Sequence, residues 1–144
     1  MNKKEWAKLV EMKSKHYLNL GDGGFDENMK AELFAYDFDE MSVTYRFTTQ
    51  KWQINERGAI HGGAIAGMFD TAFGVVANFT AGENEAATTD MNLSFLRSVE
   101  YGMSPCLKVY IIKAGRSLIR LRGELYDPDT GKILAAGSGS WMPL

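Results

Sequence analysis

Alternating apolar and polar residues predict most of the strands in this chain. From residue 41 to 47 every second residue is apolar, which is the pattern of a half-buried strand. We place this strand at residues 41–49. An apolar run over residues 31–36 precedes it, and the acidic connection between them, residues 37–40, predicts a hairpin. Four more strand-like runs follow later in the chain, over residues 90–95, 107–111, 119–125 and 133–141.

Apolar residues at helical spacing predict a first helix at the N-terminus. Within residues 2–19, Trp6, Leu9, Val10 and Tyr17 recur along one stripe. The stripe is weak, so it favours a helix that packs over the edge of the core, rather than one that lies on a membrane surface. We therefore expect an additional N-terminal helix within residues 1–20.

The central stretch, residues 62–81, predicts one long helix with two different faces. One face carries large apolar side chains: Ile65, Met68, Phe69, Ala72, Phe73 and Val76. The opposite face is made of small residues and one acid: Gly63, Ala66, Gly67, Asp70, Gly74 and Ala77. Because water would favour polar residues on that second face, we expect it to meet protein, most simply a second copy of the chain.

The order of elements predicts an α+β fold. The four C-terminal strands have short connections and are expected to be antiparallel neighbours. The simplest arrangement is an antiparallel sheet of five to six strands curled around the one long helix. We expect a single domain that spans residues 1–144.

Composition narrows the class of protein. The chain has 144 residues, 45% of them hydrophobic and 24% charged, as in an ordinary globular domain. Its net charge of −2 lacks the basic excess of a nucleic-acid-binding protein. A single cysteine, Cys106, excludes an internal disulfide, and with only two histidines a structural zinc site is not expected. Asp70 argues against a membrane span over residues 62–82. We expect a cytoplasmic protein without membrane or nucleic-acid partners.

Asp70 is the most unusual residue of the central helix. No lysine or arginine lies within four residues of it, so it has no helical ion-pair partner. Burying an unpaired carboxylate is costly. Two interpretations remain open: a catalytic carboxylate in a cleft, or one half of an ion pair with a distant arginine across an interface.

The sequence His61-Gly62-Gly63 precedes the helix and suggests a site for a carbonyl oxygen. The first N–H groups of a helix have no intrahelical acceptor, and Gly62 has no side chain to block approach to its N–H. An ordinary glycine turn is the alternative. For His61 we favour a structural role, a bond to the loop backbone, over a base or a ligand contact. The stretch 137–140, Gly-Ser-Gly-Ser, lies in a predicted strand and is not a nucleophile elbow.

A longer motif joins these residues. The pattern Asn55-x5-His61-Gly62-Gly63-x6-Asp70, followed by Thr-Ala-Phe-Gly, closely resembles the hotdog-fold acyl-CoA thioesterases of the phenylacetic-acid-degradation (PaaI-like) type. Residues 88–97 resemble the next strand of that family, and the turn at residues 113–116 fits its pattern. The resemblance covers roughly residues 47–141.

The resemblance implies a hotdog fold that dimerises by joining two sheets into one, with dimers often associating into tetramers. Active sites would lie at the dimer interface. Asp70 would act as general base or nucleophile, the Gly62 N–H would polarise the thioester carbonyl, and Asn55 and His61 would orient the water or the thioester. The implied substrate-binding residues are Gly63, Thr88, Thr89, Arg97 and Arg116. Of these, one of the two threonines would hold the water from the partner chain, and the arginines would meet the CoA phosphates. No metal or cofactor is implied, since CoA is part of the substrate.

Two other functions remain open alongside an acyl-CoA thioesterase. A hotdog dehydratase or hydratase pairs a histidine with an acid, but in a differently spaced motif. A non-catalytic acyl-CoA-binding protein would keep the pocket without needing Asp70. The acyl group is not specified by the sequence. A set of apolar residues suits an aromatic or a medium-chain pocket and equally an ordinary core: Trp52, Met68, Phe69, Phe73, Met91 and Phe95.

Overall fold

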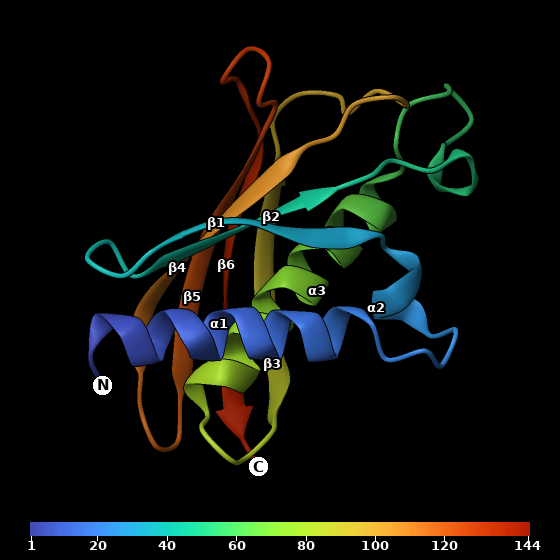
Figure 1. Cartoon of the computed structure of the whole chain (residues 1–144). Helices are drawn as coiled ribbons and strands as arrows, with labels where there is room; N and C mark the ends of the chain where they lie inside the picture. Colours follow the sequence, from blue (N-terminus) through green and yellow to red (C-terminus); the bar gives the residue numbers. More distant parts are fainter.

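The computed structural model describes all 144 residues and shows one curved sheet around a central helix (Figure 1). The helices are α1 (Lys3–Leu18), α2 (Phe25–Asn28), the 3-10 turn η1 (Lys51–Gln53) and α3 (Gly62–Thr80). The strands are β1 (Ala31–Asp37), β2 (Ser42–Phe47), β3 (Ala86–Phe95), β4 (Cys106–Ala114), β5 (Ile119–Tyr126) and β6 (Ile133–Pro143). The predicted antiparallel sheet, curled around one long helix, is confirmed.

The order of strands in the sheet is β1-β2-β4-β5-β6-β3, and every pair is antiparallel. The expectation that the four C-terminal strands are neighbours in chain order is wrong for β3, because β3 pairs with β6 rather than with β4. Two glycines of β6 explain the partner. A Cβ at Gly137 or Gly139 would lie 2.7 or 2.6 Å from a carbonyl oxygen of β3. Only glycine allows this close approach, so β6 leaves the space that β3 fills.

The large apolar face of α3 fills the concave side of the sheet, as predicted. Met68, Phe69 and Phe73 are completely buried, and Phe73 packs edge-on against Trp141 of β6. These three side chains are therefore ordinary core. Because this face is held against the sheet, the orientation of α3 is fixed.

The N-terminal helix α1 is part of the core, which confirms the predicted cap. Its first turn has a capping box between Asn2 and Glu5. Trp6 is buried and contacts the rings of Phe38 and Phe79 at centroid distances of 5.6 and 5.8 Å. Figure 1 shows α1 lying across α3. None of the helices combines the length and the apolarity that crossing a membrane requires.

A short helix that the sequence pattern did not reveal, α2, covers part of the small-residue face of α3. A Cβ at Gly67 would lie 2.6 Å from Cζ of Phe25, so the Phe25 ring rests directly on this glycine. The Thr71 hydroxyl donates a 2.7 Å hydrogen bond to Asp26. At Gly67 the expected neighbour, a second copy of the chain, is therefore wrong: the chain covers this position itself. Gly63 and Asp70 on the same face stay exposed.

Candidate active site

The start of α3 leaves one backbone donor free. His61 caps the helix, and its Nδ1 accepts a 2.8 Å hydrogen bond from the Gly63 N–H. The next two N–H groups, of Ala64 and Ile65, donate to the His61 carbonyl. The Gly62 N–H has no acceptor in the chain. It lies at the positive end of a 19-residue helix, where a developing negative charge on an oxygen is stabilised.

Asn55 lies in the loop that leads to this helix, and its side chain is fixed through one atom only. Its Oδ1 accepts hydrogen bonds from the N–H groups of Arg57, at 2.9 Å, and Ala59, at 3.2 Å. A bridge between Ile54 and Ile60 closes the loop. The Nδ2 group of Asn55 has no acceptor in the chain, so the loop holds a second free donor near Gly62.

Asn55 and Gly62 both line a cavity of about 410 Å³ between α3 and the end of β3. Its apolar wall includes Phe95 and Leu96, and two arginines, Arg57 and Arg97, also line it. The Arg97 guanidinium is held in place by a 2.9 Å hydrogen bond to the carbonyl of Ile133. The cavity therefore combines hydrogen-bond donors, apolar surface and positive charge.

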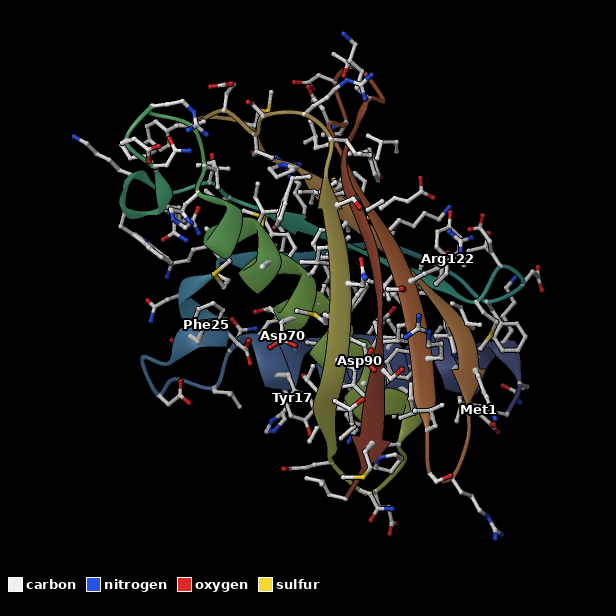
Figure 2. The ribbon with its side chains drawn as sticks, turned by 180° about the vertical axis from the view of Figure 1, so that it is seen from behind. Met1, Tyr17, Phe25, Asp70, Asp90 and Arg122 are labelled. Carbon is white, nitrogen blue, oxygen red and sulfur yellow. The ribbon has the colours of Figure 1, made fainter.

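Asp70 lies two turns further along α3 and is hydrogen-bonded to Thr88. The threonine hydroxyl donates to Oδ1 of Asp70 over 2.8 Å. Figure 2 shows Asp70 beside the edge of β3 that has no neighbouring strand. None of the ion pairs of the chain includes Asp70, so nothing within one chain supports the ion-pair interpretation. Thr89 does not share this hydrogen bond to Asp70, because its hydroxyl donates to the Ser140 carbonyl.

Within one chain these residues form two separate groups. Gly62 and Asp70 are eight residues apart on one helix, which separates them by about 12 Å at about 1.5 Å per residue. Gly62 lies next to Phe95 at the end of β3, whereas Asp70 lies next to Thr88 near its start. A donor and a base that act on one carbonyl must each come within about 3 Å of the reacting atoms. A single chain therefore does not bring Gly62 and Asp70 to the same carbonyl group.

Arg116 is also separated from Arg97. It lies exposed in the turn between β4 and β5, and β5 starts opposite Trp141, which itself pairs with Thr88. Arg116 therefore belongs to the end of the sheet where β3 begins, and Arg97 to the end where β3 finishes. Thr88 is grouped with Asp70 of its own chain by their hydrogen bond, and the supply of a threonine by a partner chain stays a prediction.

A second cavity, of about 220 Å³, lies on the other side of the helix start. Phe25, Trp52 and Ile54 form its apolar walls beside His61 and Gly63. Trp52 was a candidate from the sequence, but Phe25 was not, because no pattern links residue 25 to the central helix. The only signal was Gly67, whose missing side chain makes room for the Phe25 ring.

Other chemistries find little support among the side chains. Nowhere do three His, Cys, Asp or Glu residues gather as in a metal site. Cys106 is completely buried, and this burial raises the pKa of its thiol above the ordinary value. A neutral, inaccessible thiol is not a nucleophile.

Comparisons with known proteins bear on the family and the fold. The model of the thioesterase superfamily matches residues 57–134. Acyl-coenzyme A thioesterase 13 of Mus musculus is 26% identical over 114 residues, which cover 79% of this chain and 81% of that protein. The PaaI protein of E. coli is similar in structure, with a TM-score of 0.77, 17% identity, and coverage of 94% of this chain and 96% of that one. A Streptococcus mutans protein solved with acetyl CoA bound has a TM-score of 0.70, 17% identity, and coverage of 79% and 88%. The expected hotdog fold is thereby confirmed.

Proposed function

The chain belongs to the thioesterase superfamily, and from this membership we propose that it hydrolyses the thioester bond between an acyl group and coenzyme A. A mouse relative carries the name acyl-coenzyme A thioesterase, and a protein of the same fold binds acetyl CoA. The two arginines beside the larger cavity suit the phosphates of coenzyme A.

The observation that carries the proposal is the free Gly62 N–H at the positive end of α3, with the free Nδ2 of Asn55 in the same cavity. Two such donors stabilise the oxyanion that forms when a thioester carbonyl is attacked. The leaving group is a thiolate, which needs little protonation. A carboxylate and an oxyanion site are therefore sufficient for the reaction.

We propose that the carboxylate comes from a second copy of the chain. β3 is ten residues long and leaves one edge unpaired, which is a template for another strand. If two copies pair antiparallel along β3, the start of one β3 meets the end of the other. This pairing brings Asp70 and Thr88 of one chain toward Gly62 and Asn55 of the other. It also brings Arg116 of the first chain toward Arg97 of the second.

In this composite site the Thr88 hydroxyl donates a hydrogen bond to Oδ1 of Asp70, and Oδ2 stays free. Oδ2 either takes a proton from the attacking water or attacks the thioester carbon itself to form an anhydride. In both routes the negative charge moves to the carbonyl oxygen at Gly62, and the thiolate of coenzyme A then leaves. In the second route a water then hydrolyses the anhydride, which releases the acid and restores the Asp70 carboxylate.

The test is a pair of substitutions at Gly62, with release of the CoA thiol as the measurement. Gly62→Pro removes the N–H, and the first position of a helix tolerates proline. Gly62→Ala keeps the N–H, and its Cβ would lie at an ordinary 3.8 Å from Phe95. We expect the proline variant to lose about 10²–10³ in turnover, while the alanine variant stays close to the unmodified protein. Equal turnover in folded preparations of both variants would show that Gly62 is only a turn residue.

A further inference from the structure

The two cavities on either side of the helix start differ in polarity. The larger one contains Arg57 and Arg97 and both free donors. The smaller one contains no charged side chain, and its walls come from Phe25, Trp52 and Ile54. His61 and Gly63 line the smaller cavity, and Gly62 between them lines the larger one, so the two cavities flank the same three residues at the start of α3.

An acyl-CoA thioester has the same division of polarity. Its anionic nucleotide and polar pantetheine arm lie on one side of the carbonyl, and its apolar acyl group on the other. We propose that the 220 Å³ cavity is the acyl subsite, and that Phe25 and Trp52 make kcat/KM rise with acyl length until the cavity is full. This inference rests on the proposed thioesterase function, because it assumes a carbonyl at Gly62.

The walls of this subsite are anchored although their rings are exposed, by 59% for Phe25 and 60% for Trp52. Phe25 rests on Gly67, and the next residue, Asp26, accepts the hydrogen bond from Thr71. The Trp52 indole N–H donates to the Gln50 side chain over 3.1 Å. Two anchored aromatic rings with one face open to solvent form a preorganised apolar surface for a ligand.

The cavity volume sets the size of acyl group that it can enclose. At a share of about 30 Å³ per water-sized group, 220 Å³ holds about seven such groups. Each methylene removed from water is expected to raise kcat/KM about four-fold until the cavity is full. Beyond about seven carbons after the carbonyl, the chain extends into solvent, and the increase stops.

The experiment measures kcat/KM for straight-chain acyl-CoA thioesters from acetyl to palmitoyl, with the intact chain and with Phe25→Ala and Trp52→Ala. We expect a rise up to about octanoyl and a plateau after it. In each variant, kcat/KM should fall about ten-fold or more for hexanoyl-CoA and less than about three-fold for acetyl-CoA, because the acetyl group barely enters the cavity. Phe34→Ala is the matched control: Phe34 is 51% exposed on β1 and lines neither cavity, so the substitution should change kcat/KM for neither substrate.

Binding of S-alkyl-CoA thioethers, measured by calorimetry on the same proteins, separates this inference from the proposed function. These analogues have no bond to hydrolyse. If affinity rises with alkyl length and Phe25→Ala flattens the rise, the subsite stands even if no thioester is cleaved, and only the thioesterase proposal fails. The assigned subsite is wrong if affinity and kcat/KM continue to rise up to palmitoyl without a plateau. It is also wrong if both variants lower kcat/KM by the same factor for acetyl-CoA and hexanoyl-CoA.

Discussion

Two polar side chains at the site each use one polar atom in hydrogen bonds to the backbone and keep a second polar atom free for a ligand. His61 uses Nδ1 to cap α3, and Asn55 uses Oδ1 to hold its loop. The atoms left over are the Nε2 side of the imidazole and the Nδ2 group of the amide. Because Nδ1 accepts from a backbone N–H, the neutral imidazole carries its proton on Nε2. His61 is therefore a donor toward a ligand, which suits a thioester carbonyl better than the base of a hydratase.

At Asp70 we expect the charge to matter for chemistry and not for folding. Asp70→Asn keeps the size of the side chain and an oxygen for the Thr88 hydroxyl, but it cannot accept a proton or attack as a carboxylate. Turnover should fall at least about 10²-fold, while the midpoint of thermal unfolding stays the same. No positive charge in the chain pairs with Asp70, so none loses a partner. A lower melting temperature with nearly normal turnover would instead assign Asp70 to an interface ion pair.

Residue spacing predicts where the site lies but not which atoms are available. The motif places Asn55 before the central helix, Gly62 at its start and Asp70 within it, and the structure has all three there, while their roles stay predictions. It left Thr88 and Thr89 undecided, because a shift in register between residues 88 and 90 of β3 breaks the simple alternation. The bulge turns Thr88 toward α3 and Thr89 toward the backbone of β6. Its position depends on pairing with a strand fifty residues later, which local patterns do not contain.

At the scale of elements, periodicity predicted the long segments and missed what depends on distant neighbours. The two faces of α3 and the bounds of five strands follow from the sequence to within a few residues. For β3 the start was missed by four residues, because Ala86 and Ala87 carry no alternation. The four residues of α2 are too few for a helical period, and they are ordered by contacts to α3.

The helix α1 offers a test of whether the N-terminal segment belongs to the core. Trp6→Ala removes a buried indole that three aromatic rings surround, and should lower the free energy of unfolding by about 3–5 kcal/mol. Met12→Ala on the same helix is the control, since Met12 is exposed and should change it by less than about 0.5 kcal/mol. Urea unfolding at one fixed protein concentration measures both. Equal, small changes would mean that α1 only lies on the surface.

At the scale of the whole molecule, the separation of Gly62 from Asp70 predicts complementation between two inactive variants. When Asp70→Asn and Gly62→Pro chains are unfolded together and refolded in equal amounts, half of the pairs contain one chain of each kind. Each mixed pair has one intact composite site out of two, so about one quarter of the normal activity should return.

Refolding each variant alone is the control, and it should restore nothing. If the mixture is also inactive although mixed pairs form, the site does not combine residues from two chains. Light scattering on the refolded mixture verifies that the chains have associated.

The rigid spacing on α3 also links substrate to assembly. A ligand held by Gly62 of one chain and Asp70 of another binds the pair and not the separate chains. By thermodynamic linkage, the ligand must therefore raise the affinity of the chains for each other by the same factor by which association raises the affinity for the ligand. Dilute chains would be folded but idle. The reaction rate would then rise more steeply than in proportion to the protein concentration. Adding acyl-CoA would make the rate proportional to the protein concentration again.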